Sequence, residues 1–385
     1  MNTALNQPKP QGQPRQQGQP RQQGQPRQQG QPKQPGQPRQ QGGRAKRPTI
    51  ADIAKRAGVS KGAVSYALNG QAGVSEATRQ RILAIADEIG WSPNSAARAL
   101  SGSVAFAVGL PLCRPARTLG NEPFFMELVA GLESELSARS YALTMQVVAD
   151  VKAEITLYRR WWAERRVDGV ILVDLRIDDP RVAVIAELDL PAVIIGDPRG
   201  TGGLAGVWAD DAGALTETVE YLVALGHRRI ARVTGLPELL HTSIRNEAFA
   251  AICDRLGLTE ATVHPADYTG EESARITRRL LSSTTRPTAV IYDNDIMAVA
   301  GLSVAQEMGV RVPAELSIVA WDDSPLCKLV HPALTAVSRD IPRYGAHAAR
   351  QLLASISGQR IADFQDATPR LAPRGSTAPP DPSVR

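Results

Sequence analysis

The 385-residue chain has few cysteines, few aromatic residues and no long apolar run. Its cysteines, Cys113, Cys253 and Cys327, lie far apart, and neither they nor the five histidines follow a metal-ligand spacing. No apolar run approaches the roughly 18 to 20 residues of a membrane span. The first 47 residues also lack the apolar core of a secretory signal. These absences predict a cytoplasmic protein without disulfides, metal, cofactor or membrane partner.

Acidic residues are missing from one end of the chain. The net charge of +5 divides into +9 over residues 1–47, +2 over residues 48–102 and −6 over the remainder. The N-terminal segment repeats a hexapeptide close to GQPRQQ, with a glycine at every sixth position from Gly12 to Gly42. Because it has almost no apolar side chains, we predict that it is disordered. Two roles stay open for it: a passive solvated extension, or a polycation that contacts phosphates.

Residues 48–102 carry helix signals in close succession. Thr49 can cap a first helix with Asp52 at its N3 position, and Gly58 can end it. Ser60 and Ser75 can cap two further helices. The core-facing positions that this spacing predicts are Ile50, Ile53, Ala54, Ala57, Val64, Ala67, Leu68, Ile82, Leu83, Ala86 and Ile89. Two short helices joined by a tight turn, with a third beneath them, are typical of a helix-turn-helix domain.

A fourth helix is predicted to begin at Ser92-Pro93 and to run to Leu100. It is too short to be stable alone in water, so we expect it to fold only when a partner holds it. The segments TIADIAKRAGVS, KGAVSYALNG and SPNSAARAL, taken together, resemble the DNA-binding headpiece and hinge helix of the lactose-repressor (LacI) family. The resemblance implies a headpiece over 48–92 and a hinge helix over 93–102 that enters the minor groove of an operator.

Candidate DNA contacts follow from helix-start chemistry and from this resemblance. They are Thr49, Ser60, Lys61, Gly62, Ala63, Ser65, Tyr66, Asn69, Ala97 and Leu100. The resemblance implies that Lys61, Gly62 and Tyr66 occupy base-reading positions and that Leu100 is a wedge that kinks the duplex. Since Gly62 and Ala63 depart from the polar residues usual in the family, base reading should depend on Lys61, on Tyr66 and on thymine methyl contacts. The alternatives are a partly buried Tyr66 and a Leu100 that only ends a linker.

From Val104 onward, short apolar runs alternate with helical stretches. The runs are VAFAVGL, YALTMQVV, DGVILVD and PAVIIGD and, after Asp210, HRRIARVTG, PTAVIYDND and LSIVAWDD. They predict buried parallel strands in two successive doubly wound α/β sheets. The resemblance extends to about residue 377 and implies a bilobed, periplasmic-binding-protein-like domain over 103–377 for effector binding and dimerisation. Residues 378–385 are predicted to be a flexible tail.

Ligands of such sheets bind beyond the carboxyl ends of the strands, in the cleft between the lobes. The candidate effector-binding residues are Phe124, Phe125, Asp197, Arg245, Asp295, Trp321 and Asp322. Phe125 falls on an apolar helix face and is interpreted as structural, which leaves Phe124 as the better pocket residue. Arg245 matches the effector-contacting arginine of the family. Aspartates, an arginine and an aromatic ring would suit a sugar or similar polyol.

Two features could indicate an enzyme. The pairs Asp210-Asp211 and Asp322-Asp323 could supply acid–base chemistry, but neighbouring strand residues point to opposite faces and strand-end aspartates often cap the next helix. The glycines at 200, 202, 203 and 206 are one residue off the dinucleotide fingerprint and precede the strand-like AGVWADD, so we interpret them as a turn. Neither feature predicts catalysis.

The sequence therefore predicts a homodimeric transcriptional regulator, most simply a repressor, that binds a pseudo-palindromic double-stranded DNA operator and a small carbohydrate effector. Its last 17 residues contain five prolines and no heptads, so no C-terminal coiled coil should join dimers into tetramers. Whether the effector releases or promotes DNA binding stays open. A solute-binding protein, or an enzyme fused to a DNA-binding module, are the alternatives; the first leaves the headpiece unexplained.

Overall fold

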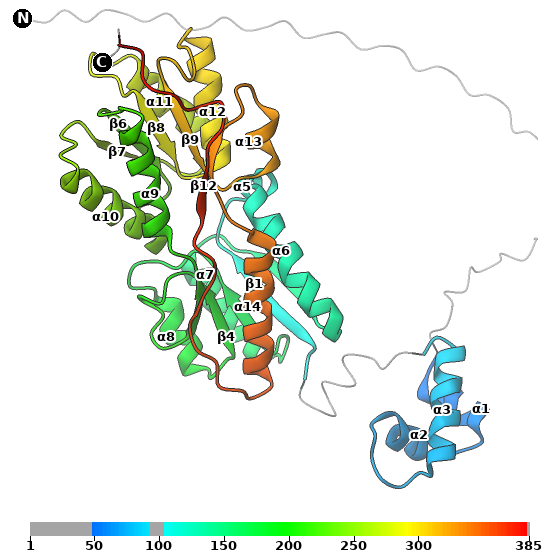
Figure 1. Ribbon diagram of the computed structural model, residues 1–385. Coiled ribbons are helices and arrows are strands. Elements are labelled where there is room, and N and C mark those ends of the chain that lie inside the picture. The colour runs from blue at the N-terminus through cyan, green and yellow to red at the C-terminus, as the bar shows by residue number, and fades with distance from the viewer. Residues whose placement is uncertain (1–47, 92–103, 383–385) are drawn as a thin grey trace, which may run out of the picture. The chain divides into compact units, whose positions relative to one another are not determined.

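The structure is a computed structural model that describes residues 48–91 and 104–382. These residues form two compact units, which divide between Ser92 and Pro93 (Figure 1). No helix in the described ranges is both long and apolar enough to cross a lipid bilayer.

The first unit consists of three helices, α1 (Ile50–Ala57), α2 (Lys61–Leu68) and α3 (Glu76–Glu88). The Asp52 carboxylate accepts hydrogen bonds from the Thr49 amide (2.8 Å) and hydroxyl (2.7 Å), which fixes the start of α1. Gly58 ends α1 with a φ of 66°, in the left-handed region that glycine favours. Ser60 caps α2 by accepting from the Ala63 amide at 3.1 Å. The three predicted helices and their caps are confirmed.

The core of this unit is small. Ile53, Val64 and Ile82, one from each helix, have no exposed surface. Leu83 was predicted to face the core but is 45% exposed. It lies about 100° around α3 from Ile82, and the helix turns only its Ile82 and Ala86 face inward. The prediction for Leu83 is therefore wrong.

The second unit has two lobes. The sheet of the first lobe contains β1 (Ala107–Leu112), β2 (Ala142–Val147), β3 (Gly169–Leu172), β4 (Ala192–Ile195), β5 (Ala205–Trp208) and β11 (Phe364–Gln365), in the order β11-β5-β4-β3-β1-β2, all parallel. Around it lie α5 (Ala116–Asn121), α6 (Pro123–Leu136), a 3-10 turn (Ser137–Arg139), α7 (Val151–Ala163), α8 (Pro180–Glu187) and α14 (Ile341–Ile356). α6 and α14 pack on one face, and α7 and α8 on the other. Every residue of β1 is buried because helices cover both faces of the sheet.

The sheet of the second lobe contains β6 (Ile230–Thr234), β7 (Thr262–Pro265), β8 (Ala289–Tyr292), β9 (Ser317–Trp321), β10 (Thr335–Ser338) and β12 (Arg370–Ala372), in the order β12-β10-β9-β8-β6-β7. Only β12 runs antiparallel. α9 (Asp211–Ala224) and α10 (Leu240–Arg255) cover one face, and α11 (Gly270–Leu281) and α12 (Asp295–Glu307) the other. The short α13 (Pro325–Leu329) follows β9.

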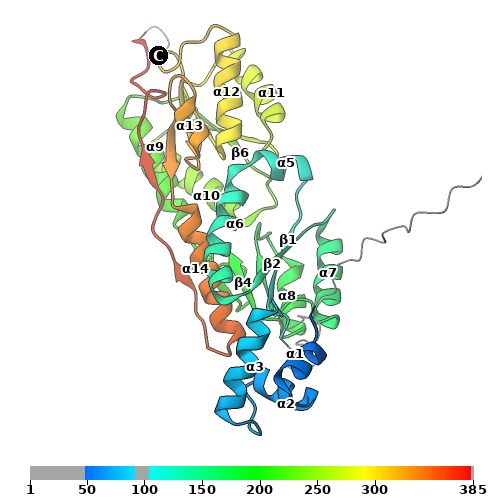
Figure 2. The ribbon, with the colours of Figure 1, turned by 90° about the vertical axis from the view of Figure 1, so that its right-hand side faces the viewer.

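The sequence predicts two sheets that simply follow one another along the chain, and the structure differs from this prediction. The chain crosses between the lobes three times: from β5 to α9, from β10 back to α14 on the first lobe, and from β11 to β12 on the second (Figure 1). α14 lies along α6 in both views (Figure 2). Gly131 permits this close approach, because a Cβ there would overlap the carbonyl of Pro342. The C-terminal segments thus complete both lobes.

The seven predicted apolar runs and the strand-like AGVWADD correspond to strands. β7, β10, β11 and β12 were missed: β7 is an exposed edge strand, and the others are two to four residues long. The flexible tail predicted from residue 378 is also not what the structure shows for its described part. The Asp381 amide donates to the Ala314 carbonyl at 3.0 Å, and the Ala378 amide to Ser317 Oγ at 3.2 Å.

Candidate functional site

α2 presents a polar face away from the small core of the first unit. Lys61, Gly62, Tyr66 and Asn69 are exposed, and Tyr66 keeps 48% of its surface free although its ring packs against Gly73. The alternative of a partly buried Tyr66 also fits this packing, so a contact between Tyr66 and DNA stays a prediction.

The remaining candidate DNA contacts of this unit lie on the same surface or at its edge. Thr49 and Ser60 are exposed at the starts of α1 and α2, while Ala63 and Ser65 are half-buried. Ser65 Oγ accepts a hydrogen bond from the side-chain amide of Asn69 at 3.3 Å, and this pair of polar groups lies at the surface. Ala97 and Leu100 lie outside the described residues.

In the second unit, the carboxyl ends of both sheets face a common cavity. It contains about 850 Å³ not occupied by protein atoms, counting the space at its open mouth. Its polar and aromatic lining comes from segments that follow strands of both lobes: Arg114, Glu122, Phe124, Asp174, Asp197, Trp208, Asp211, His241, Arg245, Tyr268, Asp293, Asp322 and Arg339. The strand-end rule therefore places the cavity correctly.

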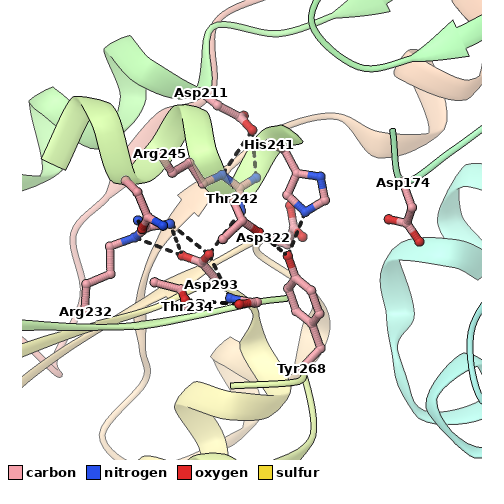
Figure 3. Close-up of polar contacts among 12 residues, drawn as sticks. Asp174, Asp211, Arg232, Thr234, His241, Thr242, Arg245, Tyr268, Asp293 and Asp322 are labelled. Carbon is pink, nitrogen blue, oxygen red and sulfur yellow. Dashed lines mark hydrogen bonds and ion pairs between the residues drawn. The ribbon is translucent and has the colours of Figure 1, made fainter. Parts of the chain in front are cut away.

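The second lobe holds its cavity residues in a network of buried ion pairs (Figure 3). Arg245 donates to Asp211 Oδ2 from Nε (3.1 Å) and Nη2 (2.8 Å), and its guanidinium lies 4.0 Å from the centre of the Trp321 ring. Behind it, the fully buried Arg232 grips Asp293 through both carboxylate oxygens at 2.8 Å. Such charges are tolerated in a protein interior only when they are paired in this way.

Arg114 is the matching arginine of the first lobe. It donates to Asp174 in a fork, from Nε at 2.7 Å and from Nη2 at 2.9 Å. Burial raises the pKa of Asp174, but the charge of Arg114 outweighs it and lowers that pKa to about 2. Arg114 also lies 4.6 Å from the centre of the Tyr268 ring, which belongs to the second lobe. The cavity floor is thus continuous between the lobes.

Tyr268 is fixed from the other side by His241. Nε2 of His241 lies 2.6 Å from the tyrosine hydroxyl, and Gly235 leaves room for the ring, because a Cβ at that glycine would overlap it. Burial, together with the charge of Arg245, lowers the pKa of His241 to about 4. The imidazole is therefore neutral at pH 7 and acts as a hydrogen-bonding group.

Arg339 lies on the crossover from β10 to α14 and lines the cavity. It donates to Asp322 Oδ1 at 2.9 Å, and its guanidinium lies 5.1 Å from the centre of the Phe124 ring. Asp322, directly after β9, has a φ of 62°, a left-handed conformation that is uncommon for residues other than glycine. Strained backbone of this kind concentrates at functional sites.

Glu122 differs from the other carboxylates of the cavity. It is only 8% exposed, and its Oε2 has no hydrogen-bond partner. Burial raises the pKa of Glu122 to about 7, with the charge of Arg114 opposing that rise. Asp211 Oδ1 is likewise buried without a hydrogen-bond partner. An unsatisfied buried acceptor is costly, so these two oxygens are the natural places for donors from a ligand.

The lobes also touch directly beside the cavity. The Ile177 amide donates to the Glu238 carbonyl at 3.1 Å, and the Leu240 amide to the Leu175 carbonyl at 2.8 Å. The two segments form an isolated antiparallel bridge around Arg176 and Leu239. Leu240 packs against the core of the first lobe. This bridge holds the lobes together on one side.

The structure brings together five of the seven residues predicted for effector binding. Phe124, Phe125, Asp197, Arg245 and Asp322 line the cavity. Phe125 is almost fully buried in the core below α6, as expected, and Phe124 is the more accessible of the two rings.

Asp295 and Trp321 are not part of the lining. β8 ends at Tyr292, so Asp293 takes the strand-end position, whereas Asp295 begins α12 and accepts from the Ile296 amide at 2.7 Å. Trp321 is fully buried on the opposite face of β9, where it supports Arg245 from below. The prediction that these two residues line the cavity is therefore wrong.

Sequence reasoning missed several cavity residues: Arg114, Glu122, Asp174, Trp208, His241, Tyr268, Asp293 and Arg339. Asp174 and Asp293 follow predicted strands and could have been found by the same rule as Asp197. Trp208 ends β5, within the strand-like AGVWADD. Arg339 had no signal, because β10 was not predicted.

The paired aspartates do not form a catalytic pair. Asp210 caps α9 by accepting from the Gly213 amide at 2.8 Å, whereas Asp211 pairs with Arg245. Asp323 similarly turns away from Asp322 to Arg374, at 2.6 Å. Gly200, Gly202 and Gly203 lie in the turn before β5, as predicted, whereas Gly206 is part of that strand.

A helix-turn-helix unit followed by a two-lobed α/β unit with a polar cavity between its lobes defines a ligand-responsive DNA-binding regulator. Residues 49–94 match the model of bacterial regulatory proteins of the lacI family, and residues 219–377 match a periplasmic binding protein-like domain. The chain belongs to the lacI family of transcriptional regulators.

Relatives cover most of the chain. The HTH-type transcriptional regulator CelR of Thermobifida fusca is 31% identical over 82% of this chain and 94% of its own length. The HTH-type transcriptional repressor PurR of Erwinia tasmaniensis is 30% identical over 81% of this chain and 91% of its own length.

Solved structures agree with this assignment. The lac repressor dimer bound to operator and the anti-inducer ONPF has a TM-score of 0.77 at 25% identity, over 86% of this chain and all of that one. A CelR–cellobiose complex has a TM-score of 0.65 at 28% identity over the same shares.

Proposed function

We propose that this regulator is a cytoplasmic, homodimeric repressor without enzymatic activity, whose operator affinity is controlled by a carbohydrate in the cavity between the lobes. The cavity is the observation that carries the proposal, because its arginine–carboxylate pairs and aromatic rings offer a polar ligand both hydrogen bonds and stacking. The CelR–cellobiose complex and the repressors among the relatives support it.

Operator contact is proposed for the exposed face of α2 and the segment beyond it. Lys61 and Tyr66 would read base edges, and the caps Thr49 and Ser60 would hold phosphates. Gly62, Ala63, Ser65 and Asn69 complete this face, with Ala97 and Leu100 in the hinge segment. A dimer places two such faces on a pseudo-palindromic operator.

A surface for dimerisation is available on the first lobe. Met126 of α6 is 60% exposed, and Met145 and Val147 of the neighbouring strand β2 are 44% and 49% exposed. Exposed apolar side chains that gather on neighbouring elements mark protein–protein contacts. A two-fold dimer would bury this surface against its own copy.

The lobes would transmit the signal by changing their relative angle. Three crossovers connect them, and short connecting segments are where hinge motion is absorbed. A ligand that binds one lobe angle better shifts the spacing of the two hinge segments and thereby the operator affinity. By linkage, operator DNA changes the affinity for the ligand by the same factor.

The proposal is tested by operator binding measured as fluorescence anisotropy. The operator is first selected from random duplex DNA with the purified chain and then titrated with and without neutral, acidic, phosphorylated and amino mono- and disaccharides. We expect at least one sugar to change operator affinity by about 5- to 150-fold. A set in which no sugar alters operator affinity, or in which one is turned over, contradicts the proposal.

Two variants separate the roles of the units. Arg245→Met should abolish the response to the sugar and keep operator affinity, while Arg255→Met, at the exposed end of the same helix, should keep both. Leu100→Ala should weaken operator binding sharply and leave sugar affinity nearly unchanged. Equal operator affinity of the Leu100 variant and the parent chain refutes the wedge role.

A further inference from the structure

The arginines that line the cavity are already neutralised. Arg114 is paired with Asp174, Arg245 with Asp211, and Arg339 with Asp322, each within 3.1 Å. Arg232, behind the wall, is paired with Asp293. An anionic ligand would therefore meet only guanidinium groups whose charge a carboxylate already balances, so its own charge would enter the cavity uncompensated.

Carboxylate oxygens, in contrast, are in excess. Glu122 is more than nine-tenths buried, lines the cavity and has no hydrogen-bond partner for Oε2. Asp211 uses one oxygen for Arg245, and its Oδ1 stays without a hydrogen bond. Both oxygens are hydrogen-bond acceptors, and they accept most strongly while the groups are ionised. The cavity therefore favours a ligand that donates hydrogen bonds to these two oxygens.

A hydroxyl group meets this demand better than a cation does. Hydrogen bonds from a neutral O–H to a carboxylate are short and about twice as strong as bonds between neutral groups. A ligand ammonium would also donate, but it would have to give up its water shell to reach these buried oxygens, and the desolvation of a charged group costs far more than that of a hydroxyl.

From this balance we propose that the effector is an uncharged polyhydroxyl compound, which donates hydroxyl hydrogens to Glu122 and Asp211, and that sugars bearing phosphate, carboxylate or amine groups are rejected. This inference rests on the proposed function and narrows its ligand to one charge class. Glu122 acts as the specificity residue, because its unpaired carboxylate repels anions and accepts from hydroxyls. Trp208, at the end of β5, adds an aromatic wall to the same space.

The experiment is isothermal titration calorimetry of the full chain with the sugar panel, in which each neutral sugar has its uronate, 6-phosphate and 2-amino counterparts. We expect a neutral member to bind, and its charged counterparts to bind at least 100-fold more weakly. A charged member that binds as tightly as its neutral counterpart, or that binds when the neutral one does not, overturns the inference. If that charged member also moves operator affinity, the proposed function survives while the inference fails. If no member of any charge moves operator affinity, the proposed function itself fails.

Glu122→Gln tests the residue directly, since it removes the charge and keeps the shape. We expect the variant to bind the neutral sugar about 5- to 20-fold more weakly and to discriminate less between the neutral sugar and its uronate. Glu217→Gln, on the exposed face of α9, is the matched control and should change neither value. An unchanged preference in Glu122→Gln rules out the assigned role, whatever its effect on overall affinity. A melting temperature of Glu122→Gln at or above that of the parent chain shows that a loss of folding is not the cause.

Discussion

The headpiece, residues 48–91, and the two-lobed unit, residues 104–382, which we call the sensor, place their functional residues in opposite ways. In the headpiece, the candidate contacts from Ser60 to Asn69 are neighbours in sequence, lie on one short helix and are mostly exposed. In the sensor, the cavity residues are spread from Arg114 to Tyr344, follow different strands and are mostly buried in ion pairs. A helix can present a site through its own periodicity, whereas a cavity needs the assembled lobes.

The comparison predicts that the sensor depends on its buried pairs much more than the headpiece depends on any charge. Asp293→Ala would leave the fully buried Arg232 without its partner. We expect the sensor to lose about 3–5 kcal/mol of unfolding free energy. Calorimetry of the full chain should show the sensor transition at a lower temperature and the headpiece transition unchanged.

Glu187→Ala is the control for that variant, because Glu187 pairs with Arg159 on the exposed surface. It should cost less than about 1 kcal/mol. If both variants cost the same, the burial of the Arg232 pair is not what stabilises the sensor, and the contrast between buried and exposed pairs disappears.

The second prediction concerns the pH dependence of the sensor. The pKa of Glu122 rises from its ordinary value of 4.5 to about 7, chiefly through burial. Arg114 opposes this rise, and the neighbouring Asp174 and Asp322 add to it. Since the folded state holds this proton more tightly, the contribution of Glu122 to stability is greatest below pH 4.5 and is lost as the pH rises to 7.

Glu122→Gln removes this dependence. Relative to the variant, the parent chain should lose up to about 3 kcal/mol of unfolding free energy between pH 4.5 and 7.5, at 1.4 kcal/mol for each unit of pKa. Urea unfolding at a series of pH values measures the difference, and the lowered pKa of His241, which acts in the opposite direction, cancels in it. Parallel curves for the two chains would mean that Glu122 is ionised throughout.

The third prediction concerns the headpiece. Tyr66→Ala should weaken binding to the selected operator by about 1–3 kcal/mol and reduce discrimination against sites that differ in one base pair. Sugar affinity measured without DNA should stay the same. An equal loss on specific and random DNA would assign Tyr66 to phosphate contact instead of base reading.

The smallest expected effect belongs to Gly62. A Cβ at this position would meet nothing closer than Ser60 Oγ at 3.8 Å. Gly62→Ala should therefore stabilise α2 by about 0.5–1 kcal/mol, because glycine is a poor helix former. Circular dichroism of the headpiece transition measures this gain. A loss of stability would show that the surface around Gly62 is less open than the structure indicates.

The headpiece and the sensor also differ in how much of their structure the sequence predicts. The caps at Thr49, Ser60 and Ser75 were predictable because a helix start depends on four adjacent residues. The central strands were predictable because burial on both faces requires continuous apolar runs. The edge strand β7 was not, since its exposed residues carry no such run.

The sequence predicted where the cavity lies, but only some of the residues that line it. Arg245 and Asp322 follow from the strand ends and from the family resemblance, but Trp321, next to Asp322, points to the opposite face of its strand. Glu122 lies ten residues beyond β1 and reaches the cavity only because α5 turns the chain back before α6 begins. No local pattern encodes such a return.

The sequence by itself determined the domain order, the helix-turn-helix and the two-lobed class, because these depend on caps and periodicities within short segments. Only the tertiary structure decided which carboxylates are neutralised and which are free. It did so by pairing β10 with β9 in the register that sets Val337 beside Trp321, which brings Arg339 to Asp322. The charge balance of a site depends on distances across the fold, and those distances are set by packing.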